Sequence, residues 1–284
     1  MNPQISADTV TSLRAQYQLD RPSPIRYLRW VSSTVHGELG FSFAYNSPVA
    51  PLLWVRAWNT LLLTLTATLL AWVIALPLGF WGATAVGRWP DRALSGTVAA
   101  LLVLPDLLLA LSLMILAVRS GWFPAGGLVS VGFEALSPLH KLRDIVLHMT
   151  MPVAALVLSS LPILVTHVRA AVTEVLGAPY LRAAAGNGIP RRRILVRYVL
   201  RAAANPLISL FGFSVGALLS GSLLVEVVMG WPGLGPLLLE AILARDLFVV
   251  IGGVLLSTVF LVGGNFLADV LLYWADPRIR IGRT

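Results

Sequence analysis

The sequence predicts an all-α protein that crosses a membrane several times. Of its 284 residues, 57% are hydrophobic and only 12% are charged, which is roughly half the charged fraction of soluble domains. A helix needs about 20 residues to cross the hydrocarbon core of a bilayer, and five apolar runs are long enough to do so. These runs are residues 59–86, 93–118, 145–176, 202–229 and 247–274.

The arginines predict which side of the membrane each loop occupies. Six of them lie in one segment between the third and fourth runs, residues 178–201, which we name the basic loop. They are Arg182, Arg191, Arg192, Arg193, Arg197 and Arg201. Short cytoplasmic loops collect Lys and Arg, so we expect the basic loop inside. Alternation then places 87–92 and 275–284 inside, and the segments outside are 1–58, 119–144 and 230–246.

This orientation agrees with the other basic residues. The inside segments contain 11 of the 21 Lys and Arg in about 40 residues, whereas the outside segments contain 9 in about 100. The sequence therefore predicts an extracytoplasmic segment 1–58, a membrane domain 59–274 and a cytoplasmic tail 275–284. Within the first segment, residues 25–35 are expected to form a short amphipathic helix.

The basic loop has the pattern of two helices joined by a glycine. Its first part, from Tyr180, is alanine-rich and favours helix, and Gly188 is placed to end that helix in a left-handed conformation. Pro190 can open the second helix, because a proline in the first turn loses no hydrogen bond. In that helix Arg193, Arg197 and Arg201 would share one face. The apolar residues of another face are Ile194, Leu195, Tyr198 and Val199.

The basic loop resembles the cytoplasmic coupling loop of ATP-binding cassette importer permeases, which inserts into a groove on a separate ATPase subunit. The resemblance rests on Y-x-R-x-A-x-x-x-G followed by R-R. It assigns ATPase coupling to Tyr180, Arg182, Ala184, Gly188, Ile189, Pro190, Arg192 and Arg193. Ala183, Asn187 and Tyr198 stand where that family usually has Glu, Lys and His. The alternative is an ordinary basic loop that only follows the inside-positive bias.

A second motif resembles one branch of these permeases, which carries dipeptides, oligopeptides or nickel. The segment 226–235 reads EVVMGWPGLG, A-x-x-x-R-D follows it, and D-P-R stands near the C-terminus. Met229 replaces the usual Phe, and near the N-terminus Glu38 replaces the Asp of a G-D-L-G-x-S segment. The matching residues are Glu226, Trp231, Pro232, Gly233, Gly235, Arg245, Asp246, Asp276, Pro277 and Arg278.

The resemblance implies a type I importer transmembrane domain in the cytoplasmic membrane of a prokaryote. Its implied partners are a second homologous permease forming a heterodimer, two ATP-binding subunits and an extracytoplasmic solute-binding protein. It leaves the substrate open among dipeptides, oligopeptides, nickel chelates and glutathione-like molecules. The family has six spans, so we expect one further span upstream of Met1.

The residue types present argue against an enzyme. A P-loop needs G-x-x-x-x-G-K-[ST], and the only lysine, Lys141, has no glycine nearby. ATP is therefore expected on partner subunits, and no cofactor is expected here. The chain has no cysteine and four scattered histidines, which predict no metal site. The basic residues lie in loops between spans, so we expect a lipid bilayer around the chain and no nucleic-acid partner.

Three polar or small-residue features within the runs have more than one interpretation. Asp106 is in the second run, where an unpaired carboxylate costs at least about 2.5–3.5 kcal/mol. It either lines a substrate path or makes a buried structural hydrogen bond, and a competing hypothesis makes it the coupling carboxylate of an ion-gradient transporter or channel. Glu226 is expected near a span end, solvated at the interface. Gly212-x-x-x-Gly216 predicts close helix packing, either within the chain or with a second permease.

Overall fold

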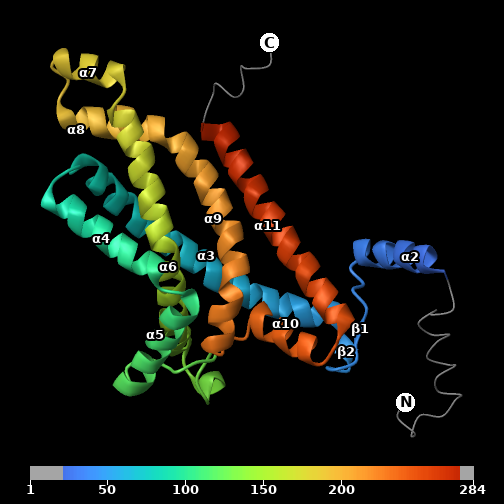
Figure 1. The fold of residues 1–284 in the computed structure, drawn as a ribbon. Coiled ribbons are helices and arrows are strands. Elements are labelled where there is room, and N and C mark those ends of the chain that lie inside the picture. The colour runs from blue at the N-terminus through green and yellow to red at the C-terminus, as the bar shows by residue number, and fades with distance from the viewer. Residues whose placement is uncertain (1–21, 276–284) are drawn as a thin grey trace, which may run out of the picture.

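The computed structural model describes residues 22–275, which are almost entirely helical (Figure 1). Helix α2 (Ser23–Val35) and a two-stranded hairpin of β1 (Phe41–Ser42) and β2 (Ser47–Pro48) precede the bundle. The bundle contains α3 (Val49–Thr84), α4 (Trp89–Val103), α5 (Asp106–Ser120), η1 (Phe133–Ala135), α6 (Pro138–Leu176), α7 (Pro179–Gly186), α8 (Arg191–Arg193), η2 (Ile194–Val199), α9 (Leu200–Val228), α10 (Leu234–Leu243) and α11 (Leu247–Ala275).

Four of the five predicted spans are single helices, and the second is broken. Helices α3, α6, α9 and α11 contain stretches long and apolar enough to cross a membrane, whereas α4 and α5 meet at an angle of 96°. The predicted span 93–118 is therefore a bent pair of helices rather than one continuous helix. Pro105 has no backbone N–H, and it disfavours helical geometry in the residue before it. Leu104 is accordingly extended, with ψ 118°.

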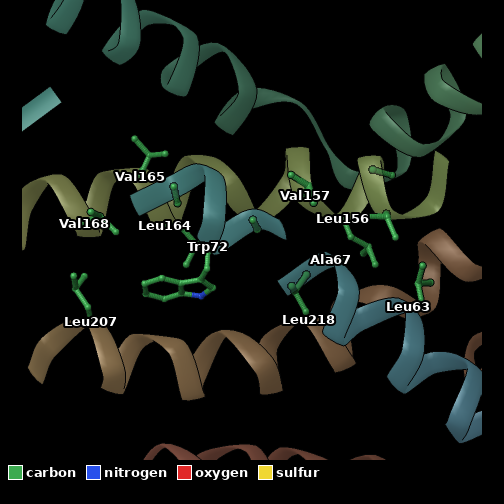
Figure 2. Packing of buried hydrophobic residues seen from close by; sticks show 14 of the residues in the cluster. Leu63, Ala67, Trp72, Leu156, Val157, Leu164, Val165, Val168, Leu207 and Leu218 are labelled. Carbon is green, nitrogen blue, oxygen red and sulfur yellow. The ribbon is translucent and has the colours of Figure 1, made fainter. Parts of the chain in front are cut away.

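The core of the bundle forms where α3, α6 and α9 pack together (Figure 2). Small residues on α3, including Ala67, Ala71 and Ala75, are fully buried and let the neighbouring helices approach closely. Trp72 fills the space beside them, and its indole N–H donates to Ser214 Oγ at 2.9 Å. Its ring also meets Phe211 edge to face, with 5.7 Å between the ring centroids. The buried indole N–H is thus satisfied inside an apolar core, as it must be.

The short amphipathic helix predicted near the N-terminus is confirmed as α2. It projects away from the bundle (Figure 1), and none of its residues is buried. The helix that follows the hairpin, α3, begins at Val49 rather than at residue 59. Its first two turns already belong to the core, because Val49, Leu53 and Ala57 have no exposed surface.

The Gly212-x-x-x-Gly216 motif packs within the chain. A Cβ atom at Gly212 would lie 1.9 Å from Ala268 Cβ, and one at Gly216 would lie 2.2 Å from Leu261 Cδ1. Both partners belong to α11, so the two glycines let α9 and α11 come together. Of the two interpretations of the motif, intrachain packing is the one that the structure supports.

This contact predicts a position-specific effect of adding one methyl group. Gly212→Ala should destabilise the fold by about 1–3 kcal/mol, because overpacking forces backbone shifts. Gly263→Ala on α11 is the matched control, since a Cβ there meets nothing within 4 Å. Thermal unfolding in detergent, followed by tryptophan fluorescence, should show a lowered midpoint for the first variant alone. Equal midpoints would contradict the close approach of α9 and α11.

Candidate functional site

The basic loop forms a compact bracket at one end of the bundle, where the C-terminal end of α11 also lies (Figure 1). Helix α7 ends at Gly186, and Gly188 has φ +76°, so its predicted left-handed conformation is confirmed. The Ile189 N–H donates to the carbonyl of Ala184 at 3.2 Å, which closes the turn. Pro190 is extended and precedes α8 as its N-cap, one position before the place predicted for it.

The second helix of the bracket departs from the predicted α-helical register. Residues Ile194–Val199 form a π-helix, whose i→i+5 hydrogen bonds bring residues five apart onto the same side. Ile194 and Val199 are both buried as a result. In a regular α-helix the two side chains would point in different directions. Arg193, Arg197 and Arg201 are all exposed, as expected of residues that share a face away from the buried Ile194 and Val199.

The bracket is anchored by apolar residues and presents its polar ones to solvent. Leu181 and Ala184 of α7 are buried together with Ile194 and Val199. The residues for which a coupling role is predicted are divided accordingly. Tyr180, Arg182, Gly188, Pro190, Arg192 and Arg193 are exposed, Ile189 is half-buried and Ala184 is buried. The arrangement is a compact, positively charged protrusion.

At the opposite end, the E-V-V-M-G-W-P-G-L-G motif forms a tight turn around a buried carboxylate. Glu226 has no exposed surface, so its expected interfacial solvation is wrong. Protein groups replace the water: Ser222 Oγ donates to the carboxylate at 3.1 Å and the Gly235 N–H at 2.7 Å. Thr60 of α3 also hydrogen-bonds to Glu226, and its oxygen accepts from the Leu234 N–H at 2.8 Å.

This packing explains why glycine occupies two positions of the motif. A Cβ at Gly233 would lie 2.4 Å from Glu226 Oε2, and one at Gly235 would lie 2.5 Å from the carbonyl oxygen of Leu223. The fully buried Trp231 donates its indole N–H to the Asn59 carbonyl at 3.1 Å. The side-chain amide of Asn59 in turn donates to the Pro232 carbonyl at 2.8 Å. The motif therefore fastens the α9–α10 turn to α3.

Asp246 of the A-x-x-x-R-D motif has a similar structural role. Its carboxylate accepts from Ser42 Oγ at 2.6 Å and from the Ala44 N–H at 3.3 Å, which ties the hairpin to the start of α11. It also caps α11 by accepting from the Val249 N–H at 3.3 Å. Arg245 takes a left-handed conformation, φ +57°, that turns the chain from α10 into α11. Asp276, Pro277 and Arg278 lie outside the described residues.

Tyr45 provides a second tether for the hairpin. Its hydroxyl donates to the carboxylate of Glu240 on α10. Burial and this hydrogen bond raise the pKa of Tyr45 to about 12. For Asp246, burial opposes ionisation, but the hydrogen bonds from Ser42 and from backbone amides outweigh it and lower its pKa below the usual value.

The lowered pKa predicts how the hairpin responds to acid. A carboxyl with a depressed folded pKa stabilises the fold above its unfolded pKa, about 3.9, and loses that contribution as pH falls through the folded value. Corrected amide exchange of 41–45 should therefore accelerate below about pH 4. Asp246→Asn should weaken the tether by about 1–3 kcal/mol at pH 7 and remove this pH dependence. Asp269→Asn, on exposed α11 surface, is the control. A hairpin equally protected in Asp246→Asn would contradict the role of the carboxylate.

Asp106 lies at the break between α4 and α5 rather than in the middle of a helix. It is exposed and lines a cavity of about 210 Å³ between α5, α6 and α9. The polar residues sharing that lining include Ser159, Ser160 and Ser214, and Asp106 is its one charged residue. A cavity with one carboxylate, several hydroxyls and apolar walls can accept a small solute with a cationic group.

One functional candidate was missed from the sequence. Arg169 of α6 forms an ion pair with Asp91 of α4, with 2.7 Å between Nη2 and Oδ1. The signal was present, because Arg169 is a charged residue inside the apolar run 145–176, and such residues usually have a partner. What the sequence does not reveal is that the partner lies 78 positions away.

These features together define a multi-pass membrane permease: spanning helices, a cationic bracket at one end and a partly polar cavity between helices. The fold is similar to that of a chain from inward-facing MetNI methionine ABC transporter, with a TM-score of 0.64 and 18% identity over 79% of this chain and 96% of that chain. It is also similar to an amino acid ABC transporter solved with histidines, with a TM-score of 0.58 and 17% identity over 78% of this chain and 94% of that one.

The family model described as binding-protein-dependent transport system inner membrane component matches residues 75–281, and the chain belongs to this family. The oligopeptide transport system permease protein AppB of Bacillus subtilis is 34% identical over 98% of this chain and 87% of its own length. The dipeptide transport system permease protein DppB of Escherichia coli is 32% identical over 97% and 86%.

Family membership determines the general role of the chain. It is a transport subunit of the cytoplasmic membrane rather than an enzyme, and it acts with an ATPase and a solute-binding protein. The predicted type I importer fold is confirmed. The importer interpretation is favoured over an ion-gradient transporter or channel that uses Asp106.

Proposed function

We propose that this permease imports peptides and is driven by ATPase subunits that grip the basic loop. The similarity to AppB and DppB along nearly the whole chain supports the substrate class. The geometry of the basic loop supports the driving mechanism, because a compact cationic protrusion at the end of a bundle is a surface on which a partner subunit can dock. ATP then binds to the partner, since the sequence has no P-loop of its own.

The basic loop is connected directly to two spanning helices. Helix α6 ends at Leu176 and α7 begins at Pro179, while α8, η2 and α9 follow one another without a gap. Displacement of the bracket therefore moves α6 and α9, which both line the cavity that contains Asp106. Closure of two ATPases under this permease and a homologous second permease would switch the cavity between outward and inward access.

The orientation that follows places α7, α8 and the α3–α4 turn in the cytoplasm. The α9–α10 turn, α10 and the hairpin then face the solute-binding protein. The cavity carboxylate of Asp106 is a suitable partner for the amino group of a peptide, because opposite charges attract more strongly in a cavity with apolar walls than in water.

The docking proposal is tested by comparing two glycine-to-valine substitutions, at positions 186 and 188. A Cβ at either Gly186 or Gly188 meets nothing within 4 Å, but only Gly188 has a positive φ. Gly188→Val should distort the bracket and cost about 1–3 kcal/mol of strain. It should abolish uptake and release the ATPases, while the permease still inserts normally. Gly186→Val should retain both. Uptake and substrate-stimulated ATP hydrolysis by Gly188→Val at the level of the control would refute the docking proposal.

The cavity proposal is tested by Asp106→Asn, which keeps the shape and removes the charge. If Asp106 meets the peptide amino group, the variant complex should assemble with normal thermal stability. Its apparent KM for a peptide with a free amino terminus should rise about tenfold, while that for an N-acetylated peptide stays unchanged. The measurement is uptake into proteoliposomes over a concentration series. Loss of assembly would instead assign a structural role to Asp106, and unchanged uptake of both peptides would exclude either role.

A further inference from the structure

An ion pair between a buried carboxylate and a partly exposed guanidinium joins α4 to α6 near the end of the bundle that carries the basic loop. Asp91, in the first turn of α4, is only 6% exposed. Its Oδ1 lies 2.7 Å from Arg169 Nη2, and its Oδ2 accepts from the Gly87 N–H at 3.0 Å. The second terminal nitrogen of the Arg169 guanidinium, Nη1, donates to Ser95 Oγ at 2.9 Å. These two charged residues thus fix the α3–α4 turn and the first two turns of α4 to α6.

Helix α3 closes the same junction from another side. A Cβ at Gly79 would lie 2.6 Å from Val168 Cγ1, and one at Gly82 would lie 2.8 Å from Leu94 Cδ2 and 3.4 Å from Arg169 Cδ. The stem of Arg169 is therefore confined between α3 and α4. The side chain itself stays 33% exposed, so its contacts with Asp91 and Ser95, rather than enclosure, hold the guanidinium in place.

The two helices that the ion pair connects lead to the two functional regions. About two turns beyond Arg169, α6 ends at Leu176 and passes into α7 of the basic loop. From Asp91, α4 runs about 20 Å, at 1.5 Å per residue, to the break at Leu104 and Pro105. Asp106 follows directly and lines the cavity. The ion pair therefore lies on one helical connection from the basic loop to the cavity carboxylate, which runs through α6 and α4, beside the direct contribution of α6 and α9 to the cavity lining.

We propose that Arg169 and Asp91 are positioning residues that make α4 follow α6 when the ATPases move the basic loop. The proposal rests on the docking of the basic loop proposed above. With the pair intact, displacement of α7 and α6 carries α4 along, and the break at Pro105 converts this into a reorientation of Asp106. Without the pair, α6 can slide past α4, so that ATP is hydrolysed while the cavity carboxylate stays in place.

The chemistry of the pair suggests a variant that keeps the fold. Removal of one partner would leave a buried charge unpaired, whereas replacement of both by neutral groups of similar volume is often neutral for stability. In Asp91→Asn/Arg169→Met, the Asn oxygen can still accept from the Gly87 N–H and the Met side chain replaces the aliphatic stem. The contact between α4 and α6 then loses its ion pair and the hydrogen bond from Arg169 to Ser95 but retains its volume.

The test uses the whole complex in proteoliposomes and measures peptide imported per ATP hydrolysed. The double variant should retain all its subunits, its melting temperature and ATP hydrolysis within twofold of wild type, while peptide import per ATP falls at least tenfold. Arg169→Lys should give an intermediate ratio, because a single ammonium lacks the planar fork that holds Asp91 and Ser95 together. The matched control is Lys141→Met/Glu134→Gln, which removes an exposed ion pair of 3.2 Å and should change nothing.

A second measurement follows the motion itself. The chain contains no cysteine, so spin labels can be attached at Leu102→Cys on α4 and Ile163→Cys on α6, both exposed positions. The distance between the labels should remain the same with and without ATP when the pair is intact, and should change by several ångströms in the double variant.

Two results would overturn the proposal. A wild-type ratio of peptide to ATP in the double variant would show that α4 does not need the pair. Parallel loss of melting temperature, subunits and hydrolysis would show that the pair only stabilises the fold. Failure of the docking proposal would appear in a different experiment, in which the ATPases remain fully coupled to the Gly188→Val permease. The two failures are therefore distinguishable.

Discussion

The buried carboxylate of Glu226 fixes the end of the bundle that faces away from the basic loop. It accepts hydrogen bonds from its own helix, through Ser222, and from the start of α10, through Gly235. Thr60 extends this network to α3. An unpartnered donor or acceptor at such a depth costs about 1–3 kcal/mol, and more if it is charged. The conformation of the α9–α10 turn is therefore restricted, and this turn determines the positions of α10 and α11.

Under the proposed docking of the ATPases, this constraint divides the molecule into a held end at Glu226 and a driven end at the basic loop. At the held end, Glu226, Trp231 and Asp246 bind α3, α9, α11 and the hairpin together with side-chain hydrogen bonds. At the driven end, the basic loop is anchored by the buried apolar side chains of α7 and η2, and most substitutions at Gly188 would strain the backbone. Helices that are fixed at one end and pulled at the other will tilt, which is the motion an alternating-access permease needs.

Much of this architecture could be predicted from the sequence because hydrophobicity reports membrane burial directly. The apolar runs located the spans, the arginines located the bracket, and Gly188 had the conformation expected of a helix-ending glycine. Hydropathy does not, however, show the direction in which each part of an apolar run points. The run 93–118 accordingly predicts a span of sufficient length but not the angle of 96° between α4 and α5 at Pro105.

The remaining differences have long-range causes. The depth of Glu226 depends on Thr60, 166 positions earlier, and the π turn at Ile194 depends on which residues the rest of the bundle buries. The pairing of Asp91 with Arg169 likewise appears only when α4 and α6 are packed together. Local propensity contains no information on such contacts. A small-residue motif indicates that a helix makes a close contact but does not identify the partner helix. Gly212-x-x-x-Gly216 predicted a close helix contact without revealing that its partner was α11.

The central claim is that a separate ATPase grips the basic loop. The most direct measurement is photocrosslinking from Ala185→Cys, an exposed position on α7, in a chain that has no other cysteine. In membranes that contain the whole complex, a probe attached there should crosslink to the ATPase subunit, and the yield should change when ATP is bound. Crosslinks only to lipid or to the second permease, in a complex that still imports peptide, would contradict the account.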